Sequence, residues 1–211
     1  MYLTIIIPMY NESGVITTTL ERLRAIEMPG FVTQVEVIAV DDCSTDDTAG
    51  LAEKISWSFP GIKLIRLPVN AGKGAAVAAG ARVANGDTII VQDADLELDP
   101  ADIPSLLRRM HNQNLDLVSG TRFGSGSGYP AHAIAAVTLN RLLSAIAAKA
   151  TGRSITDLTC GYKLIRKELF DKLYLREQRF AFETELMFKA LRVTTCTFAE
   201  EPVSYSPRRR T

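Results

Sequence analysis

Short apolar runs alternate with longer amphipathic segments along the first half of the chain. The apolar runs, rich in aliphatic and β-branched residues, are Leu3–Ile7, Val35–Val40, Ile62–Leu67, Thr88–Gln92 and Leu115–Ser119. Helical patterns lie between them at Glu12–Ile26, Asp46–Ser56, Gly74–Ala84 and Ala101–Asn112. This alternation predicts an α/β fold with right-handed βαβ units and a mainly parallel, Rossmann-like sheet flanked by helices. Ligands are expected beyond the carboxyl ends of its strands.

The pattern changes after the fifth apolar run. Gly124–Gly128 reads G-S-G-S-G, a flexible segment of the kind that forms a hinge or a lid over a site. It is followed by a helical run at Ala131–Ala150, the segment Asp157–Leu164, a helix at Phe182–Leu191 and a strand at Thr195–Ala199. This second part is therefore expected to be α+β.

Composition and charge are those of one globular domain. The 211 residues are 46% hydrophobic and 23% charged, so we expect a single domain over residues 1–211 with a sizeable core. Lys plus Arg and Asp plus Glu number 24 each, so no overall field attracts nucleic acid, and any basic site is local. We therefore expect no nucleic-acid partner.

Cysteine usage and the amino terminus favour a cytoplasmic protein. Cys43, Cys160 and Cys196 are far apart without a C-x-x-C pair, as is typical of reduced thiols. Met1 leads directly into the first apolar run, which leaves no room for a signal peptide. No run reaches the roughly 18 apolar residues that span a bilayer.

Two carboxylates follow the fourth apolar run in T-I-I-V-Q-D-A-D-L-E. Asp93 and Asp95 project the same way at the end of the predicted strand. Hard cations such as Mg²⁺ or Mn²⁺ take oxygen ligands and share them with phosphates, so the pair predicts a site for a metal-bound nucleotide diphosphate. On its own this motif is weak, because two loop-forming aspartates explain it equally well.

Three further strand ends carry polar clusters. The first reads P-M-Y-N-E and the second D-D-C-S-T-D-D-T, where Tyr10 and Asp42 could stack on a base and accept its ring N–H, while Asp46 suits helix capping. Asp42 is equally compatible with a solvated turn. The third leads into N-A-G-K-G, in which Lys73 offers a charge to a phosphate. Neither a Walker loop nor G-x-G-x-x-G spacing is present, which argues against an ATPase or a dehydrogenase.

Taken in order, these segments resemble the family 2 glycosyltransferases of the GT-A fold. The matching pieces cover nearly the whole chain: P-M-Y-N-E, V-D-D-C-S-T-D-D-T, N-A-G-K-G-A-A-V-A-A-G, D-A-D-L-E and D-L-T-C-G-Y-K-L-I-R-K-E-L-F. The chain is most similar to the branch that makes polyprenyl or dolichyl phosphate sugars, which carries D-A-D-L-Q and D-x-x-x-G-[FY]-[KR]. The resemblance implies a nucleotide-sugar-binding half at residues 1–122 and an acceptor-binding half at residues 123–211.

The resemblance also implies roles for single residues. Those that match nucleoside-binding positions are Pro8, Tyr10, Glu12 and Asp42. Those that match the segment meeting ribose, diphosphate and metal are Asp93, Ala94 and Asp95. Glu97 stands where relatives have a metal-binding glutamine, so it is a third expected ligand with an added negative charge. Arg122, in S-G-T-R-F, and Arg208, in the E-x-P-V-x-Y-x-x-R register, match phosphate-contacting arginines. For Arg208 a solvated tail is an equal alternative.

The activity implied is that of a metal-dependent inverting hexosyltransferase. It would move a hexose from a UDP- or GDP-sugar to a polyprenyl or dolichyl phosphate, with Asp95, Arg122 and Asp157 as the expected catalytic residues. A lipid monophosphate, with a second pKa of about 6, is mostly ionised at neutral pH and needs no strong base. A sugar hydroxyl would need one, and Asp157, Glu183 and Glu185 are the candidates.

Three alternatives stay open. The chain is also compatible with a family 2 enzyme that acts on a sugar hydroxyl in cell-surface glycan synthesis, or with a non-catalytic nucleotide-sugar-binding module. A nucleotidyltransferase is disfavoured, because P-M-Y-N-E replaces the expected Gly-rich basic loop.

Ala131–Ala150 is interpreted as a core helix, with an interfacial helix that contacts the cytoplasmic face of a membrane as the alternative.

Overall fold

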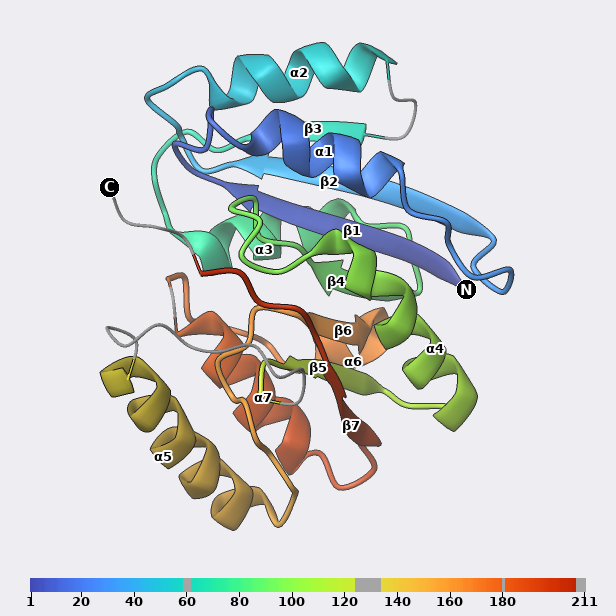
Figure 1. Cartoon of the computed structure of the whole chain (residues 1–211), viewed down its shortest axis with the longest axis vertical. Coiled ribbons are helices and arrows are strands. Elements are labelled where there is room, and N and C mark those ends of the chain that lie inside the picture. The colour runs from blue at the N-terminus through green and yellow to red at the C-terminus, as the bar shows by residue number, and fades with distance from the viewer. Residues whose placement is uncertain (59–61, 124–133, 180, 208–211) are drawn as a thin grey trace.

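The computed structural model of the chain describes residues 1–58, 62–123, 134–179 and 181–207. Within these residues, seven strands form one sheet in the order β3-β2-β1-β4-β6-β5-β7, and helices cover both of its faces (Figure 1). The predicted α/β class with a mainly parallel sheet is confirmed. The predicted flexible segment Gly124–Gly128 and the predicted phosphate contact Arg208 lie outside the described residues.

The elements follow the predicted alternation. The strands are β1 (Tyr2–Met9), β2 (Gln34–Asp41), β3 (Ile62–Arg66), β4 (Thr88–Val91), β5 (Leu117–Thr121), β6 (Lys163–Arg166) and β7 (Phe198–Pro202). The helices are α1 (Ile16–Arg24), α2 (Thr48–Ser58), α3 (Lys73–Val83), the 3-10 helix η1 (Pro100–Asp102), α4 (Ile103–Gln113), α5 (Ile134–Thr151), α6 (Lys167–Lys172) and α7 (Phe182–Arg192). No described helix is long and apolar enough to cross a membrane.

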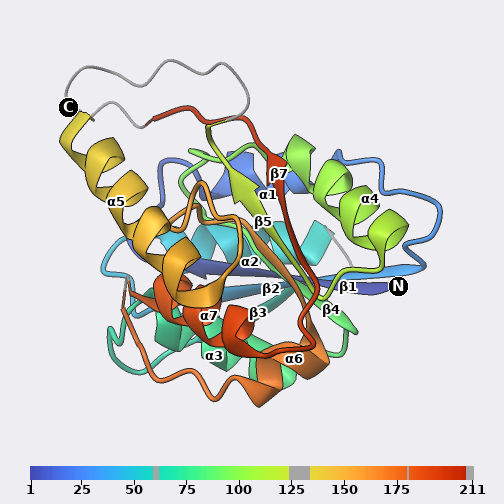
Figure 2. The same cartoon turned by 90° about the horizontal axis from the view of Figure 1, so that it is seen from below.

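Strand β1 lies inside the sheet and pairs in parallel with β2 and β4. Its side chains alternate between two apolar layers: Leu3, Ile5 and Ile7 pack with residues of α1, α2 and α4. Ile6 packs on the other face, with residues of α3, α5, α6 and α7. Burial on both faces explains why the strand is nearly continuous in hydrophobicity. Figure 2 shows the same layering from below.

Strand β6 is the main departure from the predicted elements, because no strand was assigned to K-L-I-R. It lies between β4 and β5 and is antiparallel to both, whereas β7 is parallel to β5. The strand is only four residues long and begins with a buried lysine, Lys163, so its sequence shows no clear apolar pattern. Since β6 begins beside the end of β4, the loop before it reaches the edge of the sheet where β4 and β5 end.

Several boundaries differ from the predicted ones. Helix α1 begins at Ile16 rather than Glu12, because the preceding backbone N–H groups bond to the β2–α2 loop instead of to a helix. One of these bonds runs from the Glu12 amide to the Thr48 hydroxyl at 2.7 Å. Strands β5 and β7 lie two or three residues further along the chain than predicted. Such shifts are normal where side chains compete with the backbone for hydrogen bonds.

A buried glutamate ties together the edge of the sheet where β1 and β4 begin. The Glu36 carboxylate, 5% exposed, accepts hydrogen bonds from Thr4 Oγ1 at 2.7 Å, Lys63 Nζ at 3.0 Å and the Asn85 amide at 2.6 Å. The Gly86 amide also donates to it at 3.2 Å. Burial acts to raise the pKa of Glu36, but the bonds from Thr4, Asn85 and Lys63 outweigh it and lower that pKa to about 2.

This lowered pKa predicts a pH-dependent share of the stability. Because the folded pKa lies below the ordinary value of 4.5, ionised Glu36 stabilises the fold fully above about pH 4.5, and this stabilisation is lost as the pH falls toward 2. We expect Glu36→Gln to lower the free energy of unfolding by about 3 kcal/mol at pH 7. The difference from the parent should shrink by about 2 kcal/mol at pH 3. Urea unfolding at both pH values measures it.

The exposed Glu53, paired with Arg66 at 2.9 Å, provides the matched control. Glu53→Gln is expected to leave the free energy of unfolding close to that of the parent at both pH values, since exposed ion pairs contribute little. A difference between the parent and Glu36→Gln that stays constant from pH 7 to pH 3 would contradict the assigned role of Glu36.

Candidate functional site

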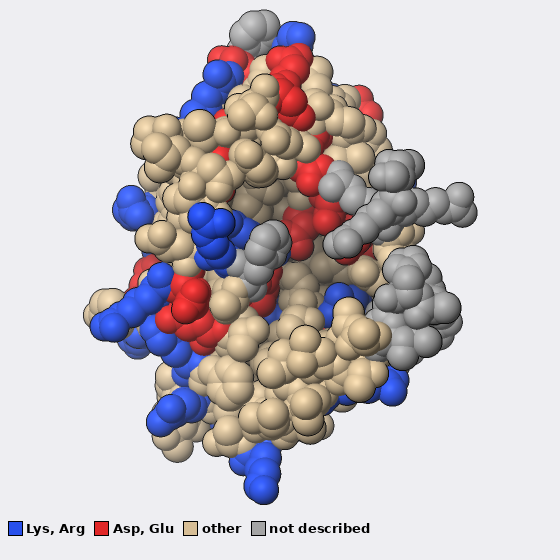
Figure 3. Space-filling model, turned by 90° about the vertical axis from the view of Figure 1, so that its left-hand side faces the viewer, with Lys and Arg blue, Asp and Glu red and all other residues tan. Residues whose placement is uncertain are grey.

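A cavity of about 470 Å³ opens at the carboxyl ends of β1, β2 and β4. Eight residues predicted from the sequence line this cavity: Pro8, Tyr10, Glu12, Asp42, Lys73, Asp93, Ala94 and Asp95. The space-filling view shows a hollow in the middle of one face with acidic side chains around it (Figure 3). The structure therefore brings together residues that are up to 87 positions apart in the sequence. We call this space the donor cavity.

The wall formed by β1 and β2 combines an exposed ring with a buried carboxylate. The Tyr10 side chain is 45% exposed, so its ring is accessible to a ligand. Asp42 is buried and accepts hydrogen bonds from the backbone amides of Ala71 and Gly72, at 2.8 Å and 2.7 Å. Asp42 is thus not a solvated turn residue. It fastens the loop before α3 to the end of β2.

Backbone strain gathers at the same strand ends. Asn11, Cys43 and Leu96 have φ values of 55°, 62° and 59°, in the left-handed region that non-glycine residues rarely adopt. They follow β1, β2 and β4. Asn11 is held there by its side chain, whose Oδ1 accepts a hydrogen bond from the Thr45 amide at 2.8 Å. Strain of this kind is common where a protein positions groups for a ligand.

Lys73, the first residue of α3, lines the donor cavity and pairs with carboxylates from two other parts of the chain. Its Nζ lies 2.6 Å from Asp93 Oδ1 and also pairs with the carboxylate of Glu183 on α7. Burial acts to lower the pKa of Lys73, but the two carboxylates outweigh it and raise that pKa above its ordinary value. Lys73 therefore stays charged and offsets part of the negative charge around Asp93.

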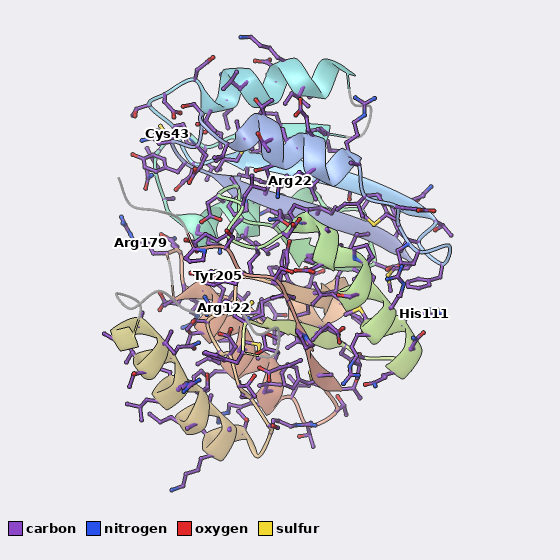
Figure 4. The ribbon with its side chains drawn as sticks, viewed as in Figure 1. Arg22, Cys43, His111, Arg122, Arg179 and Tyr205 are labelled. Atoms are coloured by element: carbon purple, nitrogen blue, oxygen red, sulfur yellow. The ribbon has the colours of Figure 1, made fainter. Side chains whose placement is uncertain are left out.

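The loop before α7 crosses the amino end of α3. The Ala75 amide donates a hydrogen bond to the Gln178 carbonyl at 3.0 Å. Gly72, with φ 98°, lies so close to this loop that an added Cβ would come within 2.6 Å of the same carbonyl oxygen. Arg179, in the same loop, lines the donor cavity and points toward the outside of the molecule (Figure 4). Sequence reasoning missed Arg179, since R-E-Q-R is an ordinary polar loop sequence.

The predicted metal ligands are divided between two cavities. Asp93 and Asp95 line the donor cavity, whereas Glu97 lines a neighbouring cavity of about 370 Å³ together with Asp95 and Tyr205. In the described part of the chain, no three His, Cys, Asp or Glu side chains gather as a metal cluster. In nucleotide sites Mg²⁺ is often held by one or two carboxylates plus phosphate oxygens, and Asp93 and Asp95 fit that set of donors.

A buried amide fixes the course of the chain after β4. Gln92 Nε2 donates hydrogen bonds to the carbonyls of Asp93 and Leu98, at 2.9 Å and 3.4 Å, and its Oε1 accepts one from the Tyr162 hydroxyl. Gly161 lies against Asp93, where an added Cβ would come within 2.5 Å of the carboxylate. Sequence reasoning missed Gln92 and Tyr162. The available signal for Gln92 was that it is the single polar residue at the end of an apolar run.

Arg122, at the end of β5, forms a two-point ion pair with Asp157. Its Nε and Nη2 lie 2.8 Å from the two carboxylate oxygens, and its backbone amide donates to Oδ2 at 2.9 Å. Asn140 Nδ2 donates to the same carboxylate at 2.7 Å. Burial acts to raise the pKa of Asp157, which is fully buried, but the bonds from Arg122 outweigh it and lower that pKa. Asp157 therefore stays ionised and holds Arg122.

Arg122 and Asp157 do not line the donor cavity, but a chain of contacts joins them to it. The Arg122 guanidinium lies over the Tyr205 ring, 5.2 Å from its centre (Figure 4). The Tyr205 hydroxyl lies 3.4 Å from Glu97 Oε2, and the Glu97 amide donates to Asp95 Oδ1 at 3.1 Å. Tyr205, which sequence reasoning missed, thus connects the two groups of predicted residues.

The loop before β6 is held from behind by α5 and by Lys163. Ser144 Oγ accepts a hydrogen bond from the Leu158 amide at 3.0 Å, and Asn140 Oδ1 accepts one from the Thr159 amide at 3.3 Å. Lys163 is fully buried, donates to Ser119 Oγ at 2.9 Å and bonds to a carbonyl of the same loop. Burial lowers the pKa of Lys163. None of these supporting residues was predicted as part of the site.

Comparison with known proteins agrees with this geometry. The family model described as Glycosyl transferase family 2 matches residues 4–174. Dodecaprenyl-phosphate galacturonate synthase of Rhizobium johnstonii is 31% identical over 181 residues, which cover 85% of this chain and 52% of the relative. A dolichyl-phosphate beta-glucosyltransferase of Trichomonas vaginalis is 31% identical over 226 residues, which cover 98% and 64%. The chain thus spans only between 52% and 64% of the length of these relatives.

Solved structures share the fold at lower identity. Glucosyl-3-phosphoglycerate synthase from Mycobacterium tuberculosis, in complex with Mn²⁺, UDP and glucosyl-3-phosphoglycerate, has a TM-score of 0.73 at 21% identity, covering 100% of this chain and 73% of that one. TarS of S. aureus in complex with UDP has a TM-score of 0.69 at 22% identity, covering 98% and 60%. These likenesses confirm the predicted GT-A type of fold. With the family model matched over residues 4–174, the chain belongs to glycosyl transferase family 2.

Proposed function

We propose that this chain is a metal-dependent inverting hexosyltransferase that moves a sugar from a nucleotide diphosphate sugar to a polyprenyl or dolichyl phosphate. The observation that carries the proposal is the donor cavity, in which an exposed ring, a lysine and the Asp-x-Asp pair meet at the strand ends. The names of the curated relatives support the acceptor, since they describe polyprenyl and dolichyl phosphate sugar transferases.

The wall of β1 and β2 would hold the nucleoside, and α3 the phosphates. Tyr10 offers a ring on which a base stacks, and Asp42 fixes the loop that forms the floor beside it. Lys73 stands at the first turn of α3, where its charge and the helix dipole both favour phosphate. Arg179, on the crossing loop, adds a second positive charge at the mouth of the donor cavity.

Asp93 and Asp95 would hold the metal ion together with diphosphate oxygens. When bound, Mg²⁺ or Mn²⁺ supplies charge neutralisation for the leaving nucleoside diphosphate. Solved neighbours were crystallised with UDP and with Mn²⁺ or Mg²⁺, which supports the use of a divalent cation. A metal-binding role for Glu97 stays a prediction, because its carboxylate contacts Tyr205 in the neighbouring cavity.

Arg122 would orient the phosphate of the acceptor. Asp157 and Thr159 fix the guanidinium on one side and the Tyr205 ring covers it on another, so it is preorganised for charge-assisted bonds to an anion. The ionised phosphate oxygen is itself the nucleophile, so the chain needs only to position it for a single displacement at the anomeric carbon. Asp157 then acts on Arg122 as a positioning residue.

A sugar hydroxyl as acceptor is less well supported, because the three candidate bases are engaged. Asp157 accepts bonds from Arg122 and Asn140, and Glu183 pairs with Lys73. Glu185 accepts bonds from the backbone amides of residues 176 and 177 and pairs with Lys189 at 2.8 Å. A hydroxyl nucleophile needs a carboxylate that is available to take its proton. We also propose a cytoplasmic location and a donor that is either a UDP-sugar or a GDP-sugar.

We expect nucleoside diphosphates to stabilise the chain mainly in the presence of metal. Thermal unfolding would be followed with UDP and with GDP, each without metal, with Mg²⁺ and with Mn²⁺. At 100 times its dissociation constant a ligand adds about 2.7 kcal/mol, which raises Tm by roughly 5–10 °C for a chain of this size. The preferred nucleotide should reach this range only with metal, since the phosphates and the two aspartates otherwise repel each other.

Asp95→Ala tests, under the same conditions, whether the protein is an enzyme rather than a nucleotide-sugar-binding module. The variant should lose the metal-dependent part of the Tm shift, and both donor hydrolysis and sugar transfer should fall by at least about 100-fold. Asp171→Asn, at an exposed carboxylate on α6, is the matched control and should behave as the parent. A parent that binds nucleotide but transfers no sugar to any acceptor would instead indicate a binding module.

Asp157→Asn separates the two acceptor hypotheses. If Asp157 positions Arg122, the KM for a lipid phosphate should rise about tenfold or more, because the guanidinium loses its fixed orientation. If it is a general base, kcat should fall by about 10²–10⁴ with little change in KM, and the acidic limb of the pH profile should disappear. An unchanged Tm shift with nucleotide and metal would show that the variant is folded.

A further inference from the structure

We propose that the outward face of α5 docks on the surface of an anionic lipid bilayer. The helix packs Leu143 and Ala147 against the core, as an ordinary surface helix does, but it also turns large apolar side chains outward. Asn140 and Ser144 are buried against the protein, whereas Leu139, Leu142 and Ile146 are 56%, 57% and 51% exposed. A surface helix of a soluble domain normally turns its apolar stripe toward the core. The core role predicted for this segment holds for Leu143 and Ala147, which pack against the other core residues, but not for Leu139 and Leu142.

The three exposed residues form a continuous stripe. Positions 139, 142 and 146 are separated by three and four residues, so their side chains lie one above the other on one side of the helix. Alanines 135 and 145 are also exposed. Figures 1 and 2 place α5 at the outer edge of the molecule, and Figure 3 shows the lower part of this face as uncharged surface with basic side chains at its border.

Charge points to the occupant of this stripe. Between Arg122 and Asp157 the sequence has no Asp or Glu, whereas Arg141, Lys149 and Arg153 are basic. Basic residues beside a leucine stripe suit an anionic bilayer, in which the apolar side chains enter the headgroup boundary and the cations stay at the surface. A second copy of the chain fits less well, because two copies facing each other through α5 would bring like charges together without an acidic partner.

The opposite side of the same helix reaches the candidate acceptor site. Asn140 bonds to Asp157, and Asp157 holds Arg122. Arg141 lies over the ring of Phe123, 5.1 Å from its centre, next to Arg122 in sequence. A bilayer under α5 would thus lie close to the guanidinium that we assign to the lipid phosphate. This inference rests on the proposed function only for the purpose of the docking, which is access to a lipid phosphate. The docking itself needs neither a sugar donor nor an acceptor.

Vesicle flotation tests the docking on the whole chain. The vesicles would be phosphatidylcholine alone and phosphatidylcholine mixed with phosphatidylglycerol. The parent should bind the mixed vesicles, and the triple variant Leu139→Gln, Leu142→Gln, Ile146→Gln should lose at least about tenfold in partitioning. Arg141→Gln and Lys149→Gln should each reduce binding to the anionic vesicles by about fivefold. Glutamine keeps the helix propensity of the replaced positions.

The matched control changes exposed apolar residues elsewhere. The side chains of Val69, Val83 and Tyr174 are 63%, 46% and 80% exposed. The triple variant Val69→Gln, Val83→Gln, Tyr174→Gln should leave partitioning into vesicles unchanged. Circular dichroism and the Tm shift with nucleotide and metal would show that each variant is folded. A parent that ignores anionic vesicles, or a triple variant that binds them equally well, overturns the proposal. The proposal is also overturned if the parent is a dimer in solution and the triple variant at positions 139, 142 and 146 is a monomer.

Two acceptors separate this proposal from the proposed function. The triple variant should keep transfer to a short, water-soluble prenyl phosphate but lose it toward a long polyprenyl phosphate embedded in mixed vesicles. If the parent fails to transfer sugar to the short acceptor, the proposed function fails while vesicle binding is judged on its own. If the variant loses both transfers to the same degree, α5 serves the site itself and the docking proposal is wrong.

Discussion

The contact between Lys73 and two carboxylates is the interaction on which this site depends. Asp93 follows β4, Glu183 stands on α7 and Lys73 begins α3, so a single ammonium group joins three elements that are far apart in the sequence. Lys73 thus lies between two carboxylates and offsets part of their mutual repulsion. The lysine thereby fixes the Asp93 carboxylate at the wall of the donor cavity.

The two sides of the site are built in different ways. On the donor side, strand ends carry the functional groups directly, and the strained backbone at Asn11, Cys43 and Leu96 fixes their direction. On the proposed acceptor side, Arg122 is placed by a hydrogen-bond network that includes Asp157 and α5. A rigid sheet edge suits a ligand of constant shape such as a nucleotide. Because the network around Arg122 includes α5, the position of Arg122 depends on whatever α5 contacts.

Much of the donor side could be predicted from the sequence, because parallel strands end at one edge and each end carried a recognisable polar cluster. Tyr10, Asp42 and Asp93 accordingly lie around one cavity. Strand β6 could not be predicted, since four residues beginning with a buried lysine show no periodicity. Glu97 was expected among the metal ligands because it stands where relatives have a metal-binding glutamine. Spacing does not reveal that the chain turns through Leu96 and carries Glu97 toward Tyr205.

Supporting residues were harder to find than the residues that they support. Asn140 lies in an alanine-rich helix, and its amide bonds to a buried carboxylate 17 positions later. Long-range partners of this kind are set by the fold, and no local pattern indicates them. Arg179 in its loop is a similar case, because it gains meaning only where the loop crosses α3.

The reversed direction of β6 has a consequence for how such proteins diversify. An antiparallel strand begins at the sheet edge where its neighbours end. The loop before β6 therefore lies at the edge formed by the ends of β4 and β5. That loop and α5 belong to one contiguous stretch of chain, whereas the residues that line the donor cavity, apart from Arg179, come earlier in the sequence. Replacing that stretch as a cassette would change the surroundings of Arg122 and leave most of the lining of the donor cavity in place.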